Sequence, residues 1–378
     1  MKRREFLVKA GMTSAGLASV TWMLGGPARV RAESGGITGT PGADAPPWRT
    51  FELTAKIEVL KPVGVTRIWM PAALSTETPY QQTLANTFAA GEGGKAELVK
   101  GKSDALGIIA AEFPDGVKPT FTVSSRVSTR NVAIDLSGKG SSAHKESKSD
   151  LEHFLRPTKL IPTDGLVKSA AAQITANAKT DVEKARAIYE WIVDNTFRNP
   201  KTRGCGTGDI RSMLEMKDLG GKCADLNALY VGLARASGLP ARDVYGIRVA
   251  KSELGYKSLG ANTEVITKAQ HCRAEVYLSE FGWVPVDPAD VRKVVLEEPP
   301  GNRTLDDEMV KAARARLFGS WEMNWVAYNF AHDVELPGSS GKALGFLMYP
   351  QAETVEGRID SLDPDNFKYT ITTQEIKA

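Results

Sequence analysis

Residues 220–230, which read GGKCADLNALY, constrain the fold more than any other stretch of the sequence. From Leu226 onward, apolar residues recur at the three- and four-residue spacing of one buried helical face, which predicts a helix. The two glycines allow a sharp backbone turn before the helix, and Gly238 followed by Pro240 ends it. We therefore expect Cys223 at the start of a helix that lies in the core.

This position favours ionisation of the Cys223 thiol. The unpaired N–H groups and the dipole at a helix N-terminus stabilise negative charge, so a thiol there ionises more readily than a free one. The alternative is that Cys223 is a small apolar core residue, as many free cysteines are. Asp225 and Asn227 lie in the same turn and are expected to cap the helix and to offset its dipole.

A second stretch, residues 270–288, contains candidate partners for this thiol. It reads QHCRAEVYLSEFGWVPVDP and predicts a β-hairpin, because arms rich in Val, Tyr and Trp flank a turn that contains Gly. His271 begins one arm and Asp287 ends the other, so both are expected near the open end. A thiol, an imidazole and a carboxylate in this order are the nucleophile, base and orienting group of covalent catalysis.

Together these motifs resemble the bacterial transglutaminase-like superfamily. The resemblance covers residues 151–293 and rests on the GKC at the helix start, on GLPAR at residues 238–242, and on the H…EVY…GWVPVDP of the hairpin. It implies an α+β, papain-like core, in which a helix that carries the cysteine packs on an antiparallel sheet that carries the histidine and the aspartate.

The resemblance also implies a role for each residue of the motif. Cys223 matches the nucleophile, His271 the base and Asp287 the orienting carboxylate. Many members have a small residue and an aromatic after the histidine, whereas this chain has Cys272 and Arg273, which indicates an unusual substrate side of the site.

The register of the hairpin leaves a second candidate for the carboxylate. If residues 279–282 form the turn, His271 faces Asp290, and Asp287 lies on the other side of the pleat. A bulge at one of the two prolines of this arm would return Asp287 to the face of His271. Asp290 is therefore the alternative orienting residue.

Three weaker candidates for the walls of the cleft are Trp191, Gln270 and Arg273. Trp191 or Gln270 could add a donor to an oxyanion site that begins with the backbone N–H of Cys223. A glycine-rich loop, RGCGTG at residues 203–208, is expected to shape the same cleft, because none of the dinucleotide-binding spacings is present.

Zinc is the alternative use of the sulfur and imidazole side chains. The ligands would be Cys205, Cys223, Cys272 and His271, but their spacings match no tetrahedral motif, and adjacent strand residues point to opposite faces. We therefore predict no metal and no cofactor. The remaining histidines, which are expected in surface or structural roles, are His144, His153 and His332.

The chain contains three cysteines, so a single disulfide leaves one thiol unpaired. In an exported protein the nucleophile must be the unpaired one, which points to a Cys205–Cys272 disulfide. Two separately buried thiols are the alternative.

Residues 1–32 have the features of a twin-arginine export signal. Arg3 and Arg4 precede a weakly apolar run at residues 10–26, and Ala32 ends a small-x-small cleavage pattern. These features predict passage through the twin-arginine export machinery, cleavage after Ala32, location in the periplasm and no stable membrane span after processing. An uncleaved anchor is the alternative, although the run is short for a span of about 20 residues.

The slightly basic balance of the chain belongs to this leader. The whole chain has a formal charge of +3, and removal of residues 1–32 changes it to −2. The remainder has no basic stripe with interleaved aromatic residues, so we predict no nucleic-acid partner.

The rest of the chain divides into five predicted segments. Alternating apolar and polar residues predict a small β-sandwich, a polar run predicts a boundary, and a capping box at residues 180–183 predicts a helix. The segments are a disordered linker (33–48), the β-sandwich domain (49–136), a second linker (137–150), the catalytic domain (151–295) and a C-terminal extension with a helix and strands (296–378).

These features predict an exported thiol enzyme that acts on an amide of a protein or peptide. The thiolate would attack the carbonyl to give a thioester, and water or an amine would then take the acyl group. The triad alone does not decide between hydrolysis and transfer. The alternative is a binding or scaffold protein that keeps the fold but does not need an ionised Cys223.

Overall fold

The computed structural model describes residues 28–30, 46–138, 140 and 145–377. Most of the predicted export signal, its cleavage point after Ala32, most of the linker at 33–48 and His144 lie outside the described residues. Among the residues that are described, no helix combines the length and the apolar character needed to cross a bilayer.

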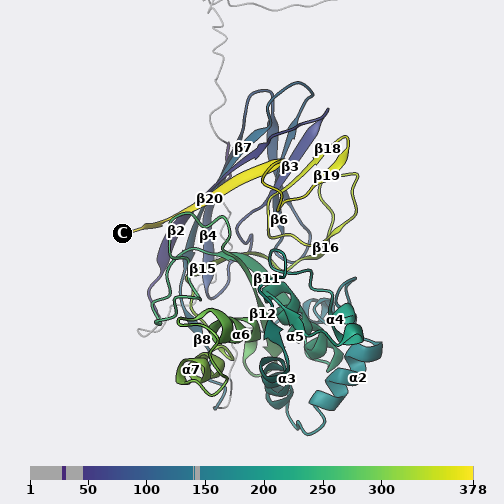
Figure 1. Ribbon diagram of the computed structural model, residues 1–378, viewed down its shortest axis with the longest axis vertical. Helices are drawn as coiled ribbons and strands as arrows, with labels where there is room; N and C mark the ends of the chain where they lie inside the picture. Colours follow the sequence, from purple (N-terminus) through teal and green to yellow (C-terminus); the bar gives the residue numbers. More distant parts are fainter. Residues whose placement is uncertain (1–27, 31–45, 139, 141–144, 378) are drawn as a thin grey trace, which may run out of the picture.

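The described chain forms a β unit and an α+β unit, one above the other in Figure 1. The β unit contains two five-stranded sheets. The first sheet holds, in spatial order, β1 (Ala28–Val30), β4 (Gln81–Ala90), β7 (Thr120–Thr129), β2 (Arg49–Val59) and β20 (Phe367–Ile376). The second holds β19 (Gly357–Ile359), β18 (Gln351–Thr354), β3 (Thr66–Pro71), β6 (Gly107–Phe113) and β5 (Lys95–Lys100).

The two sheets pack face to face as a sandwich. Alternate residues of β2 are buried, and the core between the sheets joins Phe51 and Phe121 of one sheet to Ile68 and Ile109 of the other. This is the alternation that the sequence displays, because successive strand residues point to opposite faces. The N-terminal all-β unit therefore fits the prediction.

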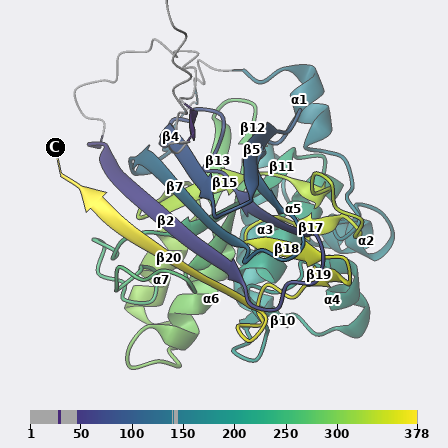
Figure 2. The same ribbon diagram turned by 90° about the horizontal axis from the view of Figure 1, so that it is seen from above.

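The C-terminal strands complete this sandwich. β20 pairs antiparallel with β2 from Thr50 opposite Ile376 to Val59 opposite Phe367, and Figure 2 shows the two strands side by side. β18 pairs with β3 in the other sheet. Residues 296–378 are thus not one extension: their helix joins the α+β unit, and their last strands join the β unit. Local sequence patterns do not report pairing between the two ends of a chain.

The α+β unit is built on a four-stranded antiparallel sheet. In spatial order its strands are β13 (Gly282–Val286), β12 (Gln270–Leu278), β11 (Ala241–Arg248) and β15 (Trp325–Asn329). The helices are α1 (Lys148–His153), α2 (Gly165–Ile174), α3 (Asp181–Asn195), α4 (Ile210–Met216), α5 (Cys223–Ala236), α6 (Pro288–Glu297) and α7 (Glu308–Arg316). Short two-stranded pairs are β8 (Val132–Ala133) with β14 (Ser320–Trp321), β9 (Phe197–Arg198) with β10 (Gly220–Gly221), and β16 (His332–Val334) with β17 (Leu344–Phe346).

Helix α5 is the centre of this unit. It packs against β11 and β12 on the sheet and against α2, α3 and α6 around it, so its residues from Cys223 to Arg235 are all buried. The predicted capping box of α3 is present, with Thr180 and Glu183 each bonded to the other's backbone N–H. Helix α6 was not predicted, because its first residue, Pro288, has the features of a strand end. The fold class, helices with antiparallel sheets, is as predicted.

The hairpin of β12 and β13 has a shorter turn than predicted. Leu278 pairs with Gly282, which has φ +77°, so residues 279–281 form the loop. This shift of one residue places Asp287 on the face of His271 without a bulge. The predicted four-residue turn is therefore wrong, and so is its consequence for Asp287.

Candidate active site

Cys223 is the first residue of α5, and its side chain is buried. The strand β10 that leads into it pairs in parallel with β9. A Cβ on Gly220 would lie 2.3 Å from the ring of Phe197, and one on Gly221 would lie 2.5 Å from Cβ of Asp225. The two glycines thus permit close packing at the helix start, in addition to the turn.

Asp225 fixes the glycine-rich loop beside the thiol. Its carboxylate accepts hydrogen bonds from the backbone N–H of Lys222 at 3.0 Å and of Thr207 and Gly208, both at 2.9 Å. The first bond is the predicted cap, and the other two hold the loop. The backbone N–H of Ala224 also donates to the carbonyl of Cys205, at 2.9 Å, so Cys205 is placed next to the helix start.

The three cysteines are all buried, free thiols. The thiols of Cys205 and Cys272 both lie close enough to Cys223 to affect its ionisation. This structure contains no Cys205–Cys272 disulfide, so that pairing stays a prediction of the sequence. The Cys205 thiol donates its single hydrogen to the carbonyl oxygen of Gln270, at 3.3 Å.

These contacts hold the pKa of the Cys223 thiol well below its usual range. The neighbouring Cys205 thiol has the largest effect, followed by the Cys272 thiol, and the His271 imidazole acts in the same direction against the effect of burial. The pKa of Cys205 is raised by the neighbouring Cys223 and by burial, and that of Cys272 is raised by burial and by Cys223. The thiolate of this cluster is thus at Cys223.

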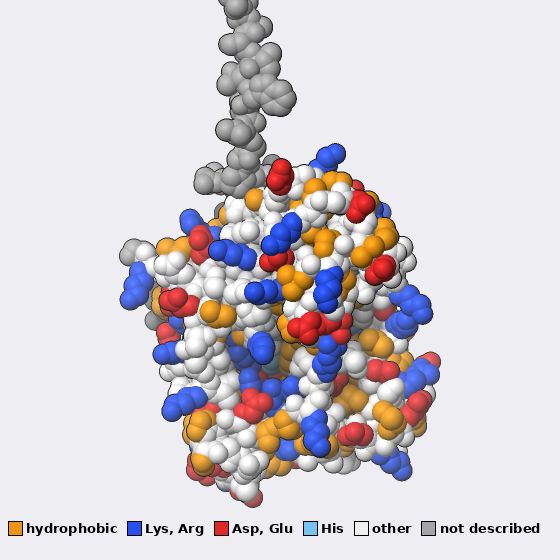
Figure 3. All heavy atoms as spheres, turned by 45° about the horizontal axis from the view of Figure 1, so that its top comes forward, with side chains coloured by type: hydrophobic (Ala, Val, Ile, Leu, Met, Phe, Trp, Pro, Cys, Tyr) orange, Lys and Arg blue, Asp and Glu red, His pale blue; other side chains and the backbone are white. Residues whose placement is uncertain are grey.

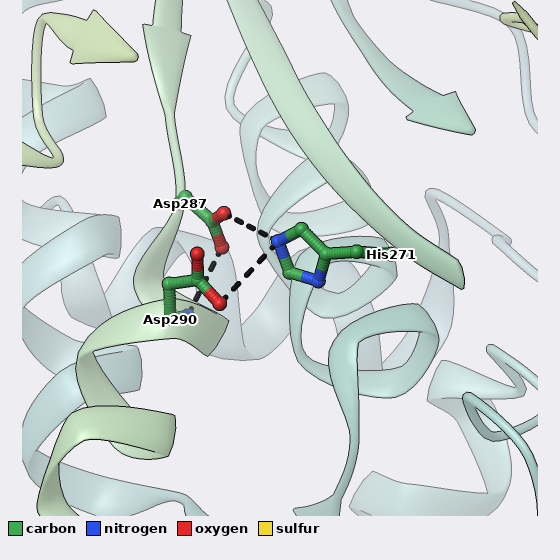
Figure 4. Close-up of side chains that lie close together, drawn as sticks. All are labelled: His271, Asp287 and Asp290. Carbon is green, nitrogen blue, oxygen red and sulfur yellow. Dashed lines mark hydrogen bonds and ion pairs between the residues drawn. The ribbon is translucent and has the colours of Figure 1, made fainter. Parts of the chain in front are cut away.

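His271 contacts two carboxylates (Figure 4). Its Nε2 lies 2.8 Å from Oδ2 of Asp287 and 3.4 Å from Oδ1 of Asp290. Nδ1 is the ring nitrogen that remains for the thiol. Burial and the charge of Arg248 lower the pKa of His271, but the two carboxylates outweigh them and raise it to about 9. At neutral pH, His271 is therefore a protonated imidazolium beside the Cys223 thiolate.

Asp287 is the carboxylate in direct hydrogen-bond contact with His271. It is fully buried, and burial together with the charge of Asp290 raises its pKa. Its Oδ1 accepts from the backbone N–H of Asp290 at 3.0 Å and from Nδ2 of Asn227 at 3.3 Å. Asn227 also donates to the carbonyl of Cys272, at 2.8 Å, so the prediction that Asn227 caps α5 is wrong.

The site opens into a cavity of about 740 Å³ between the two units. Cys205, Cys223, Gln270 and His271 lie on one side, and residues 367–369 of β20 lie on the other. In the space-filling view of Figure 3, this face is hollowed between the two units, and Lys and Arg side chains gather around the hollow. A substrate that enters the cavity thus contacts both units.

Of the three weaker candidates for the walls of the cleft, only Gln270 lines the cavity. Its Nε2 is buried with no hydrogen-bond partner among the described residues. Trp191 does not line it and packs on the core from α3. Arg273 is buried behind Asp287, where it donates to the carbonyl of Glu322 at 3.0 Å and stacks on Trp325. Trp191 and Arg273 are therefore not cleft residues.

Comparison with known proteins agrees with this arrangement. The sequence model of the transglutaminase-like superfamily matches residues 168–288, which contain the cysteine, the histidine and Asp287. An uncharacterised protein of Haemophilus influenzae is 34% identical over an alignment 342 residues long that covers 86% of this chain and 91% of that protein. The chain therefore contains a transglutaminase-like superfamily domain.

Two solved structures are similar to this chain to different extents. A protein of Cytophaga hutchinsonii, described provisionally as a cysteine protease, matches with a TM-score of 0.51 and 15% identity over 87% of this chain and 98% of that chain. The periplasmic domain of TgpA from Pseudomonas aeruginosa matches 64% of this chain and 88% of that domain at 14% identity, with a TM-score of 0.35. The first match extends the shared fold to the β unit.

The transglutaminase-like site has features unsuited to a metal ion. Ligand atoms of His271, Asp287 and Asp290 lie within 4.8 Å of one another. However, one nitrogen of Arg248 contacts both oxygens of Asp290, at 2.6 and 2.8 Å, and Nε of Arg273 lies 3.7 Å from Asp287. Two guanidinium groups already neutralise these carboxylates, so a divalent cation would meet positive charge. In the described part of the chain, the ligands of the zinc alternative form no comparable cluster.

Sequence reasoning missed Arg248 and the true role of Asn227. A signal for Asn227 exists, because it lies four residues after Cys223 and therefore on the same helical face. No such signal marks Arg248. Of the other histidines, His153 lies 2.7 Å from a carboxylate oxygen of Asp104, and His332 lies 3.2 Å from one of Asp243. Both pairs lie outside the catalytic cluster.

Proposed function

We propose that this chain is an exported thiol enzyme that cleaves amide bonds through a thioester on Cys223. The observation that carries the proposal is the buried group of Cys223, His271 and Asp287, in which the pKa of the thiol is lowered and that of the imidazole is raised. A structural cysteine needs no such partner. The description of the Cytophaga hutchinsonii protein as a cysteine protease is consistent with this chemistry.

In the first step, the Cys223 thiolate attacks the carbonyl carbon of the amide. The negative charge moves to the carbonyl oxygen, and the C–N bond then breaks as His271 gives its proton to the leaving amine. In the second step, water or an amine attacks the thioester, His271 takes its proton, and the thiolate leaves. Asp287 holds the imidazole in place through both steps.

Two groups are candidates to stabilise the oxyanion. The backbone N–H of Cys223 has no acceptor among the described residues, as expected for the first residue of a helix. The Nε2 of Gln270 is a buried donor without a partner in the wall of the same cavity. Both are free to donate to a developing negative charge.

Alkylation of the thiol across a pH series tests the proposal. Iodoacetamide should modify Cys223 well below pH ~8.5, where an ordinary thiol is mostly protonated. His271→Ala should move this profile up towards that of a free thiol, because it removes the imidazolium. A folded His271→Ala variant with an unchanged profile would contradict the dyad and favour the scaffold alternative.

The fate of the thioester is tested with a peptide set offered with and without a primary amine. Mass spectrometry then distinguishes free acids, formed by hydrolysis, from new amides, formed by transfer. A protein that labels at low pH but converts no peptide amide would have an active thiol without the proposed reaction.

A further inference from the structure

We propose that the catalytic cavity selects an anionic substrate, a peptide that carries carboxylate groups close to the scissile amide. The inference rests on the proposed function for the identity of the reacting amide. The preference for an anion follows from the charged side chains of the cavity wall. The reaction of the thiol does not itself require these charges.

The charged side chains that line the cavity all have one sign, apart from the catalytic groups. Seven of the lining residues are basic and none is Asp or Glu. They are Arg198, Arg203, Lys222, Arg248, Lys268, Lys293 and Lys368. The chain as a whole has 48 basic and 45 acidic residues, so this excess is local and does not reflect overall composition.

Four of the seven are paired with carboxylates that do not themselves line the cavity. Arg248 pairs with Asp290, Arg203 with Asp360 at 2.6 Å, and both Arg198 and Lys293 with Glu297. Seven positive charges against three carboxylates leave an excess of four. This excess faces the space that a substrate enters.

The other three have no carboxylate partner in the described part of the chain. Lys222 precedes Cys223 in the chain, Lys268 lies three residues before His271, and Lys368 projects from β20 on the other unit. Lys268 and Lys368 are exposed, and Lys222 is half-buried. Positive charge therefore borders the reacting thiol on both sides of the cavity.

Lys293 indicates that the unliganded wall carries unfavourable charge. Its side chain is only 17% exposed, and its pKa is lowered by burial and by the nearby charge of Arg248. An anion in the cavity would favour the charged form of this lysine and relieve the repulsion among the basic groups. A cationic substrate would increase that repulsion.

The size and the polar lining of the cavity suit a short peptide. Its volume of about 740 Å³ falls within the range of sites that enclose a small organic ligand. The hydroxyl of Ser361, which accepts a hydrogen bond from Gln351 at 3.2 Å, keeps its own hydrogen for donation at the same wall. Lysines spread over both sides suit several separate carboxylates, from acidic side chains or from a peptide C-terminus.

Alkylating reagents of different charge test the field at the thiol. We compare the rates at which anionic iodoacetate and neutral iodoacetamide modify Cys223. Lys222→Gln/Lys268→Gln/Lys368→Gln should lower the iodoacetate-to-iodoacetamide rate ratio by about three- to tenfold, because a cleft of one sign concentrates counter-charged reactants. Raising the salt from about 0.05 to 0.5 M should lower the wild-type ratio in the same direction.

A charge-matched variant controls for net charge. Lys118→Gln/Lys148→Gln/Lys311→Gln removes three lysines whose side chains are 70%, 91% and 50% exposed and which do not line the cavity. It should leave the ratio unchanged. Equal effects of the two triple variants, or no effect of either, would overturn the proposal.

Binding to Cys223→Ala separates this inference from the proposed reaction. In fluorescence anisotropy, a labelled hexapeptide with glutamate on both sides of a central amide should bind about tenfold more tightly than its glutamine counterpart. A glutamine peptide with a free C-terminus, against its amidated form, distinguishes the α-carboxylate from side-chain carboxylates as the recognised group. Equal affinity for the glutamate and glutamine peptides, and for the free and amidated C-termini, would overturn anion selection even if Cys223 proved to be a nucleophile. Charge-selective binding by a protein whose Cys223 shows ordinary thiol reactivity would retain anion selection and refute the reaction.

Discussion

Arg248 contacts both carboxylate oxygens of Asp290 with a single guanidinium nitrogen, at 2.6 and 2.8 Å, and both side chains are buried. This pair explains how two carboxylates can lie beside one imidazole. Arg248 holds the pKa of Asp290 well below its usual range, although burial opposes this effect. Asp290 thus keeps its charge in the core, while Asp287 makes the shorter contact with His271.

Arg248→Met should lower the free energy of unfolding by about 3–5 kcal/mol, because it leaves the Asp290 carboxylate buried and unpaired. Urea unfolding measures the loss. Arg248→Met/Asp290→Leu should recover most of it, since neither charge then remains. A double variant no more stable than the single one would show that the arginine acts through packing alone.

The pKa of about 9 at His271 predicts a second step in the alkylation of Cys223. Below pH 9 the imidazolium pairs with the thiolate and weakens it as a nucleophile. Above pH 9 the proton is lost, so the rate should rise again. Asp287→Asn should move this second step down by about one to three pH units, because the carboxylate raises the pKa of His271. A second step that stays at the same pH in Asp287→Asn would exclude Asp287 as the cause of the raised pKa.

Cys205 is predicted to activate Cys223 through its neighbouring thiol. Cys205→Ala should shift the first step of Cys223 alkylation to higher pH, since the Cys205 side chain is the largest influence that lowers the pKa of Cys223. Cys205→Ser, which keeps a donor, should shift it less. Mass spectrometry of the Cys223 peptide measures both profiles. Equal profiles for wild type and Cys205→Ala would leave His271 and Cys272 as the activating groups.

Local patterns in the sequence predicted the elements that carry the site. Apolar spacing predicted α5, the capping box predicted α3, and arms rich in Val, Tyr and Trp around a glycine-containing turn predicted β12 and β13. These features depend on residues close in sequence, which local side-chain periodicity reports. The predicted face of Asp287 was sensitive to the length of the turn. A change of one residue in that length moves every side chain of the strand to the opposite face of the sheet.

Contacts between distant segments could not be predicted in this way. The Arg248–Asp290 pair joins residues 42 positions apart, and β2 and β20 are separated by almost the whole described chain. Nothing in the pattern of β2 distinguishes a central strand from an edge strand. The basic cavity was also missed, because its lysines and arginines come from six separate segments and become one surface only in the folded protein.

Twin-arginine export remains a prediction of the sequence. Arg3→Lys/Arg4→Lys should abolish delivery of the protein to the periplasm, because the paired arginines are the feature by which this signal is recognised. Cell fractionation with an antibody against the protein measures the outcome. Deletion of Met12, which shortens the leader by one neutral residue, serves as the control. Undiminished delivery of the double variant would contradict this route.

Gly206 is predicted to be essential for the contact between the glycine-rich loop and α5. Its φ is +97°, and a Cβ there would lie 1.8 Å from Oδ2 of Asp225, a distance that no rearrangement of the side chain alone can accommodate while Thr207 and Gly208 remain bonded to it. Gly206→Ala should therefore displace Asp225, destabilise the fold and disturb the helix start that carries Cys223.

Gly116→Ala is the matched control, because Gly116 also has a positive φ, +80°, but nothing lies within 4 Å of its added Cβ. The backbone strain is then similar in the two variants, so a larger loss of stability and a higher alkylation pH in Gly206→Ala alone would report the clash with Asp225. Equal losses of stability with an unchanged Cys223 profile in both variants would show that the loop can move away without affecting the thiol.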